Sequence, residues 1–369
     1  MNILDSVLPQ INQLTPYTPG KPVEEVEREL GISNAIKLAS NENPLGCSEK
    51  VIQLFSDVRN QLSIYPDANA FYLKQALAKK LNVNADTITI GNGSNDVLDI
   101  IARSFLTEGK QAIFSEYAFL VYPLVTQACG ATSVVTKALA RNSEQPYGHD
   151  LKAMLDAITD ETALIFIANP NNPTGTWLKK SDLYDFIKQV PAHIAIVIDE
   201  AYFEYVEESD YPDALKWLGE FDNLIVTRTF SKIYGLAGLR LGYSISSPEI
   251  CNVLNRVRQP FNGNSIALAA AIESLNDDQF VSESKRVNQQ SLIKLKQYCQ
   301  DRGLFYIPSV GNFLTVEFPG KAMEIYQKLM SKGVIVRPVA NYELNDFLRI
   351  SMGSESQMKL LVNALEDIL

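Results

Sequence analysis

One stretch of the chain combines a lysine, two hydroxyl groups and an arginine in a spacing that suits a loop. Residues 229–243 read TFSKIYGLAGLRLGY, and two glycines separate Lys232 from Arg240. Helices and strands both avoid glycines at such spacing, so a loop is expected. The amine of Lys232 could form a Schiff base with an aldehyde. Thr229, Ser231 and Arg240 could hold a phosphate group of the same molecule.

A carboxylate follows the apolar stretch IAIVI. Residues 199–202 read DEAY, so Asp199 would lie at a buried sheet edge, with Tyr202 three residues further on. Burying this charge without a partner is costly. A protonated ring nitrogen of a ligand would supply the partner, and a salt bridge to Arg228 or Lys232 is the alternative.

The glycine-rich segment GNGSND, residues 91–96, opens an expected helix. Glycines let the backbone approach an anion, the N–H groups of a helix N-terminus favour a phosphate, and Ser94 adds a hydroxyl donor. In the alternative interpretation, Ser94 or Asn95 only caps the helix. Asp96 stands where a dinucleotide-binding fingerprint has its third glycine, which disfavours an NAD-binding domain.

A further turn, NPNNPTG at residues 169–175, contains two Asn-Pro steps that fix a rigid shape and display amide side chains. The four segments thus offer a phosphate site, an amide and a tyrosine for a ring oxygen, a carboxylate for a ring nitrogen, and a lysine for an aldehyde. These features together describe the binding of pyridoxal 5′-phosphate (PLP). The carboxylate would keep the pyridine nitrogen protonated, so that the ring could accept electrons from a carbanion.

The elements that would position these segments alternate between short apolar strands and amphipathic helices. Runs such as IAIVI are apolar at every position, which is typical of strands buried on both faces of a mostly parallel sheet. In such sheets ligands bind beyond the carboxyl ends of the strands, where the four segments lie. We therefore expect an α/β fold with a mostly parallel seven-stranded sheet in an α/β/α sandwich. The expected strands span residues 87–93, 111–115, 131–136, 162–169, 194–202, 223–230 and 241–246.

The character of the chain changes after residue 275. A long polar helix is expected over residues 277–303, and mixed strands and helices follow, which indicates a smaller α+β domain. Ser354 and Gln357 form a capping-box pattern that predicts the start of the last helix. The N-terminal arm lacks a core of its own and is expected to lie over the rest. The predicted division is an arm with part of the small domain over 1–40, a large PLP-binding domain over 41–275, and the small domain over 276–369.

Composition excludes several classes of function. The chain has 369 residues and a formal net charge of −10, which argues against a general nucleic-acid or anionic-membrane binder. Its four scattered cysteines lack the spacing of a zinc site and fit a reducing compartment. Neither a secretory signal nor an 18-residue apolar run is seen, so a cytoplasmic protein is expected.

The motifs NPNNPTG, DEAY and TFSKIYGLAGLRLG, in this order and spacing, resemble those of the fold-type I, aspartate-aminotransferase-like PLP enzymes. The resemblance covers nearly the whole chain. Within that superfamily, LASNENPLG (38–46), YPD (65–67), GNGSND and the closing VIVRP and FLRIS are similar to the histidinol-phosphate aminotransferases.

The resemblance implies a role for each matching residue. Lys232 matches the Schiff-base lysine, which also moves the proton during the reaction, and Asp199 matches the partner of the pyridine nitrogen. Asn172 and Tyr202 match the pair that binds the ring hydroxyl. Tyr65 matches a tyrosine that reaches the phosphate from the neighbouring subunit, which implies a homodimer with shared active sites. The phosphate cradle is matched by Ser94, Asn95, Thr229, Ser231 and Arg240.

The resemblance also implies how substrates bind. Arg349 matches the arginine that receives the carboxylate of glutamate, a task for which its planar guanidinium is suited. Arg349 together with Arg337 and Tyr17 would engage the phosphate or tail of the other substrate. The aromatic residue that stacks on the cofactor often follows Pro-Thr in this family, but the run here is YAFLVY. Spacing assigns the stacking role to Phe119, and Tyr117 is the alternative.

The implied reaction is transamination between L-glutamate and imidazole-acetol phosphate, which gives 2-oxoglutarate and L-histidinol phosphate in histidine biosynthesis. Two alternatives remain open at this point. An arginine-lined pocket could instead serve an aromatic or broad-specificity aminotransferase, and a related enzyme decarboxylates threonine phosphate. A PLP-binding transcription regulator is disfavoured by the acidic charge.

Overall fold

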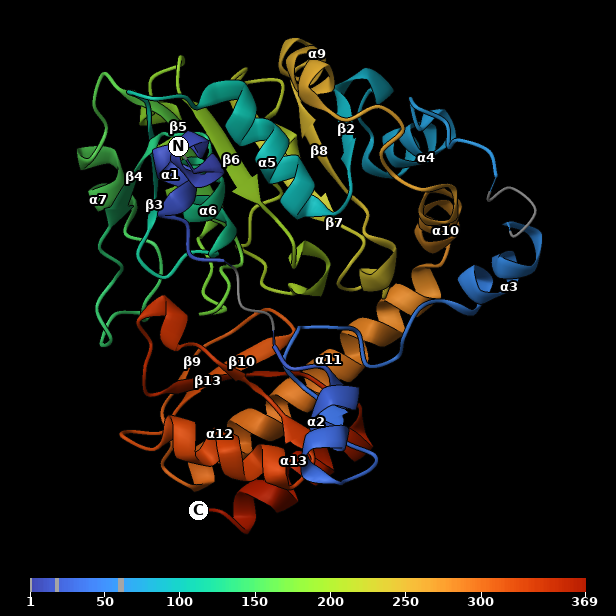
Figure 1. Cartoon of the computed structure of the whole chain (residues 1–369), viewed down its shortest axis with the longest axis vertical. Coiled ribbons are helices and arrows are strands. Elements are labelled where there is room, and N and C mark those ends of the chain that lie inside the picture. The colour runs from blue at the N-terminus through green and yellow to red at the C-terminus, as the bar shows by residue number, and fades with distance from the viewer. Residues whose placement is uncertain (1, 17–19, 59–62) are drawn as a thin grey trace.

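A seven-stranded sheet forms the centre of the larger part of the molecule (Figure 1). The computed structural model describes residues 2–16, 20–58 and 63–369. In the strand order β2-β8-β7-β6-β5-β3-β4, β8 runs antiparallel to both neighbours and the other pairs are parallel. The predicted fold class is therefore confirmed. The strands are β2 (Ile88–Gly91), β3 (Gln111–Ser115), β4 (Thr132–Thr136), β5 (Thr162–Ala168), β6 (Ala195–Asp199), β7 (Leu224–Thr229) and β8 (Gly242–Ser246).

Two predicted strands end two or more residues earlier than expected. The strand predicted over 87–93 ends at Gly91, because Gly93 has a φ of +86° and is the N-cap of the next helix. The strand predicted over 194–202 ends at Asp199, where the chain turns into the 3-10 helix η4 (Phe203–Tyr205). Both turns point polar groups beyond the end of the sheet, where a ligand can reach them.

Helices cover both faces of the sheet because its central strands are apolar on both sides. Val197 packs in one core with α5 (Ser94–Phe105), α6 (Val121–Ala128) and α9 (Pro248–Val257). Ile196 and Ile198 pack in the opposite core with α7 (Leu151–Asp156) and α8 (Lys180–Gln189). This alternation is what a strand buried on two faces requires. A third cluster near β2 and β8 includes residues of α3 (Glu49–Val58), α4 (Phe71–Leu81) and α10 (Ser265–Leu275).

The smaller part of the molecule is built on a four-stranded antiparallel sheet of order β12-β13-β10-β9, which Figure 1 shows below the large sheet. Ser354 and Gln357 form the predicted capping box at the start of the last helix. The elements are α11 (Asp278–Asp301), β9 (Tyr306–Ile307), β10 (Phe313–Glu317), α12 (Ala322–Ser331), β11 (Val334–Ile335), β12 (Arg337–Pro338), β13 (Phe347–Ser351) and α13 (Glu355–Glu366).

The segment VIVRPV does not form one strand. Its first half, β11, pairs in parallel with β1 (Ile36–Lys37), whereas its second half, β12, joins the four-stranded sheet. The helix α2 (Val23–Leu30) packs in the same small core as Ile335 through Val26. The N-terminal segment thus contributes to the smaller part, while the domain boundaries at residues 40 and 275 stay predictions.

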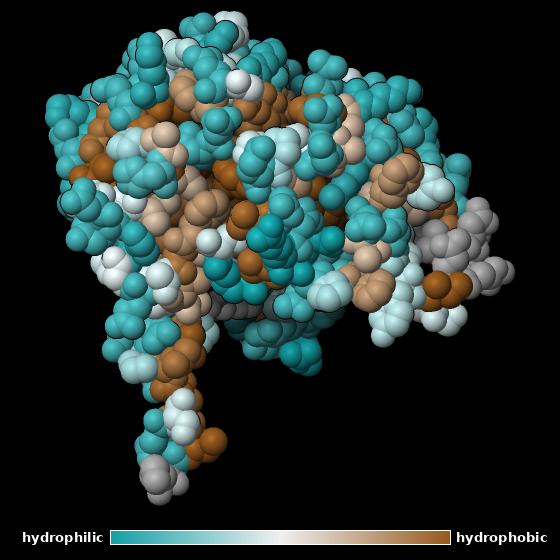
Figure 2. Space-filling view, turned by 90° about the horizontal axis from the view of Figure 1, so that it is seen from above, coloured by the Kyte–Doolittle hydropathy of each residue, from teal (hydrophilic) through white to brown (hydrophobic). Residues whose placement is uncertain are grey.

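The N-terminal arm contains η1 (Ile3–Ser6) and α1 (Pro9–Asn12) and buries none of its residues within them. Ile3 is 80% exposed, and Figure 2 shows the arm projecting from the body with apolar side chains. The prediction that the arm of residues 1–40 lies over the rest is therefore wrong for the exposed η1. It holds for α2 and β1, which pack on the smaller part, and at Gln10, whose carbonyl accepts a hydrogen bond of 3.2 Å from Gln127. A segment this short cannot form a hydrophobic core alone, so its apolar side chains stay exposed.

The remaining short 3-10 helices lie in connections between these elements. No described helix combines the length and the apolar character that a bilayer crossing requires. The 3-10 helices are η3 (Ala85–Thr87), η5 (Ala214–Trp217), η6 (Ala237–Leu239) and η7 (Ala340–Tyr342).

Candidate active site

One cavity collects most of the side chains that the sequence singled out. It lies where the carboxyl ends of the large sheet face the small sheet. Tyr65 is not among its walls: it is 78% exposed and stacks on Phe261, with ring centroids 4.7 Å apart. Tyr17 lies outside the described residues. The predicted residues that line the cavity are Ser94, Asn95, Phe119, Asn172, Asp199, Tyr202, Thr229, Ser231, Lys232, Arg240, Arg337 and Arg349.

Asp199 ends β6 and is 4% exposed. Its two carboxylate oxygens accept hydrogen bonds of 2.9 Å from the hydroxyls of Tyr122 and Thr227. Burial raises the pKa of Asp199, and these hydrogen bonds and the nearby Lys232 amine oppose the rise. The two hydroxyls orient the carboxylate but are themselves neutral, so the position also suits a ligand cation such as a protonated ring nitrogen.

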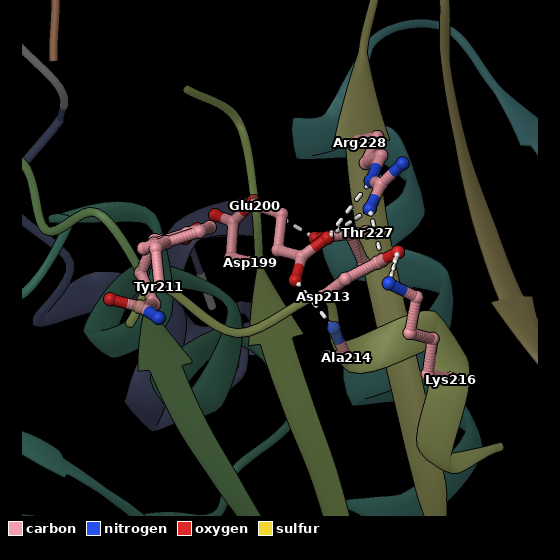
Figure 3. A network of polar contacts seen from close by, with 9 residues as sticks. Asp199, Glu200, Tyr211, Asp213, Ala214, Lys216, Thr227 and Arg228 are labelled. Atoms are coloured by element: carbon pink, nitrogen blue, oxygen red, sulfur yellow. Dashed lines mark hydrogen bonds and ion pairs between the residues drawn. The ribbon is translucent and has the colours of Figure 1, made fainter. Parts of the chain in front are cut away.

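Two salt bridges were considered as alternatives for Asp199. The one to Arg228 is absent among the described contacts, whereas Lys232 acts on the Asp199 carboxyl electrostatically. Arg228 instead donates through Nε and Nη2 to Glu200 at 2.8 and 2.7 Å, and through Nη2 to Asp213 at 3.2 Å (Figure 3). Asp199 and Thr227 are partners in the β6–β7 register. Because successive side chains of a strand point to opposite faces, the next residues, Glu200 and Arg228, lie on the other side.

Lys232 lies in the loop after β7 and carries the only lysine amine among the described residues of the cavity wall. Its Nζ donates to the carbonyl of Ser40 at 3.3 Å and lies 5.6 Å from the ring centroid of Tyr202. The Lys232 amine also lies near enough to Asp199 to influence that carboxyl electrostatically. The amine therefore sits beside both the buried acid and the tyrosine, as a lysine that bonds to a cofactor aldehyde requires.

The segments around the start of α5 form a cradle for an anion. The N-cap of α5 is Gly93, without a side-chain capping bond, so the interpretation of Ser94 or Asn95 as the cap is wrong. A Cβ atom on Gly93 would overlap Nη2 of Arg240, which explains the need for glycine. Nη1 of Arg240 reaches Ser231 Oγ at 3.2 Å. Free helix N–H groups, a hydroxyl and a guanidinium thus converge, which is a suitable environment for phosphate.

Two arginines form the opposite wall. Arg337 and Arg349 are direct partners in the β12–β13 register, and they are only 9% and 7% exposed. Like charges placed opposite each other destabilise a sheet. Arg349 donates to Asn172 Oδ1 at 2.5 Å and to the carbonyl of Ala39 at 2.7 Å, while its buried Nε lacks a partner among the described residues. An anionic substrate group would satisfy both the charge and the free donor.

The structure separates the two candidates for the stacking aromatic residue. Phe119 lines the cavity, whereas Tyr117 makes an edge contact with Tyr147, at 5.5 Å between centroids, and is not in the cavity wall. Stacking by Phe119 therefore stays the prediction that the geometry favours.

Among the described residues, sequence reasoning missed three whose side chains hydrogen-bond to predicted site residues. Thr227 could have been found, because it lies two positions before Thr229 and strand alternation places both on one face. Tyr122 follows Phe119 by three residues in the same aromatic run, which was a weaker signal. Asn41, whose side chain contacts Tyr202, gave no signal beyond the motif that contains it.

Comparisons with known proteins agree with this geometry. Residues 33–365 match the family model described as aminotransferase class I and II. The chain is 51% identical to histidinol-phosphate aminotransferase 2 of Pseudomonas fluorescens, over 98% of this chain and 96% of the relative. It is 48% identical to histidinol-phosphate aminotransferase 2 of Methylococcus capsulatus, over the whole of both chains. The crystal structure of histidinol-phosphate aminotransferase from Sinorhizobium meliloti in complex with pyridoxal-5′-phosphate superposes with a TM-score of 0.89, at 30% identity, covering 98% of this chain and 97% of that one.

Proposed function

Because the chain belongs to the class I and II aminotransferases, and within them to the histidinol-phosphate aminotransferases, we propose that it transfers the amino group between L-glutamate and imidazole-acetol phosphate. The products are 2-oxoglutarate and L-histidinol phosphate, in the biosynthesis of L-histidine. The observation that carries this assignment is the identity of 51% over 98% of the chain. The buried arginine pair is consistent with it, since both substrates are anions.

The cofactor is PLP, and the described residues fit it. Asp199 is a buried carboxylate that accepts hydrogen bonds from the neutral hydroxyls of Tyr122 and Thr227, and Gly93 leaves room for Arg240 at a helix N-terminus. When bound, PLP supplies an electron-accepting ring that stabilises negative charge at the α-carbon of the substrate. Asp199 would hold the ring nitrogen, and Asn172 and Tyr202 the ring oxygen. The phosphate would be held by Ser94, Asn95, Thr229, Ser231 and Arg240.

The remaining predicted side chains of the cavity can then be given roles. The amine of Lys232 would carry the proton to and from the substrate α-carbon, because it is the general acid–base group within the wall. Arg349 would bind the α-carboxylate of glutamate in a bidentate manner, since Asn172 and the Ala39 carbonyl fix the plane of its guanidinium. Arg337 would meet the phosphate of the other substrate. Phe119 would cover one face of the ring.

A substrate comparison tests this function against its alternatives. We expect kcat/KM with histidinol phosphate to exceed that with phenylalanine by at least about tenfold. The reason is that the second buried arginine can bind the phosphate group of histidinol phosphate, which phenylalanine lacks. Initial rates with 2-oxoglutarate as acceptor, measured for histidinol phosphate, phenylalanine and threonine phosphate, give the ratio. A preference for phenylalanine would favour an aromatic aminotransferase. Release of carbon dioxide from threonine phosphate would contradict transamination as the main activity.

We further propose that the enzyme is a homodimer and acts in the cytoplasm. Tyr65 lies outside its own cavity, exposed and stacked on Phe261, where it could reach a neighbouring subunit. The projecting arm exposes Ile3 and Leu4, which are 80% and 62% accessible, and a second subunit would cover them. The cytoplasmic location is supported by four cysteines that are all free.

Mixing two defective subunits tests the shared site. A Tyr65→Ala subunit keeps its own Lys232, and a Lys232→Ala subunit supplies Tyr65, so a mixed dimer contains one complete site. Co-refolding the two variants in equal amounts is expected to restore about a quarter of the wild-type activity if the dimer is symmetric. Activity equal to the mean of the two separate variants would contradict the proposal.

A further inference from the structure

The segment of residues 39–41 touches both sides of the cavity. The carbonyl of Ala39 accepts a hydrogen bond from Arg349 at 2.7 Å, and the carbonyl of Ser40 accepts one from Lys232 at 3.3 Å. The side chain of Asn41 reaches Tyr202. Three consecutive residues therefore connect the small sheet, through Arg349, to the lysine and the tyrosine of the large part.

The orientation of the Asn41 amide is determined by its neighbours. Ser351 Oγ donates to Asn41 Oδ1 at 2.8 Å and accepts the Asn41 backbone N–H at 2.8 Å. Asn312 Nδ2 donates to the Asn41 carbonyl at 2.9 Å. Because Oδ1 is bonded to Ser351, Nδ2 must face Tyr202, and it donates to the Tyr202 hydroxyl at 2.9 Å. Asn41 is 1% exposed, so water does not compete for these bonds.

This arrangement determines whether the Tyr202 hydroxyl donates or accepts a hydrogen bond toward the cavity. A phenol has one proton to donate and two lone pairs that accept. Asn41 occupies a lone pair, and no described residue accepts the proton. Burial raises the pKa of Tyr202, and Arg349 and the Asn41 amide oppose the rise. Tyr202, which lines the cavity, is therefore presented to a ligand as a hydrogen-bond donor.

We propose that Asn41 is a positioning residue, which directs the O–H of Tyr202 at the ring oxygen of the cofactor and is itself held in place by Ser351 of the small sheet. The inference rests on the proposed placement of PLP and adds a residue that acts through Tyr202. Its consequence is that the position of the small sheet, which carries Ser351 and Arg349, affects how strongly the ring oxygen is bound.

The test compares Asn41→Ala with Asn288→Ala. Asn288 is a matched control, because it is also a buried asparagine beside the small sheet, but it donates to Gly311 and does not touch Tyr202. Two quantities are measured: the Kd of the apoenzyme for PLP, and the pH midpoint at which the visible absorbance of the PLP-bound enzyme titrates. A donated O–H stabilises the ring oxygen as an anion, so weaker donation raises that midpoint.

For Asn41→Ala we expect the Kd for PLP to rise roughly three- to tenfold, and the midpoint to rise by about half a pH unit or more. Ser351→Ala should shift the midpoint in the same direction by less, because the amide then remains but is free to rotate. Asn288→Ala should leave the midpoint unchanged, even if its melting temperature falls. A midpoint for Asn41→Ala equal to that of the wild type would overturn the proposal.

A second comparison establishes whether Asn41 acts through Tyr202. In a Tyr202→Phe background, Asn41→Ala should add no further shift of the midpoint, because no hydroxyl remains to be oriented. An equal shift in both backgrounds would overturn the positioning role. A wild-type enzyme without a visible PLP band would instead contradict the proposed function, so the two failures can be told apart.

Discussion

Replacing Lys232 by alanine is expected to lower the rate of transamination by at least about 10⁴-fold, while PLP still binds. The reason is that Lys232 carries the only lysine amine in the described wall of the cavity. Without it, the described wall of the cavity holds no other lysine amine that could serve as the base. The carboxylate of Asp199 and the phosphate cradle remain, so the cofactor keeps most of its polar contacts.

The rate is measured as steady-state turnover of glutamate, and PLP binding is measured from an absorbance spectrum of the same preparation. Lys152→Ala is a suitable control, because the side chain of Lys152 is 82% exposed, pairs with Asp156 one helical turn away and is not part of the cavity wall. The control should keep wild-type turnover. A Lys232→Ala variant that retained more than about a hundredth of the wild-type rate would remove Lys232 from its assigned role, since proton transfer alone contributes about that much.

Replacing Asp199 by asparagine is expected to lower kcat about 10³-fold. The amide has nearly the shape of the carboxylate and can still accept a hydrogen bond from Tyr122 or Thr227, but it cannot balance a ring cation. The ring nitrogen would then lose its proton, and the ring would accept electrons less well. The effect should appear in kcat more than in KM for glutamate, because Arg349, the proposed site for the glutamate carboxylate, is untouched.

Asp199→Glu and Asp213→Asn complete the comparison. Glutamate keeps the negative charge and should recover part of the lost rate, although its extra methylene misplaces the carboxylate. Asp213 is a carboxylate of the neighbouring Arg228 network whose side chain is 30% exposed, and its replacement should leave kcat unchanged. If Asp199→Asn and Asp213→Asn had equal kcat, the charge of Asp199 would have no specific role in turnover.

The side chains that follow strand ends could be predicted from the sequence for a physical reason. An apolar run that stops at a polar residue indicates where a buried strand leaves the sheet, and parallel strands bring these ends together. Asp199, Lys232 and Ser94 were all found in this way, and all line one cavity. The large sheet followed from the same apolar runs.

The same reasoning does not distinguish the adjacent residues Asp199 and Glu200. Both follow the same strand, and the letters DE do not tell which carboxylate faces the cavity. Only the register of β6 with β7 shows that Asp199 pairs with Thr227, while Glu200 binds the buried Arg228 on the other side. A pattern of single residues contains no such cross-strand information.

Contacts between segments that are distant in the chain could not be predicted from the sequence either. Asn41 and Ser351 lie 310 positions apart, and the φ of Asn41 is +55°, a backbone conformation that no local pattern predicted. Tyr65 lies outside the cavity of its own chain, so its position suggests no function within a single chain. Its predicted role depends on a second subunit.

A single absorbance titration tests the central claim, that this cavity binds PLP and uses it to transfer an amino group. The purified protein, incubated with PLP and freed of excess, is expected to show a visible absorption band. Adding L-glutamate should abolish the band, and adding imidazole-acetol phosphate should restore it. A protein that stays colourless after incubation with PLP, or a band that glutamate leaves unchanged, would contradict the account.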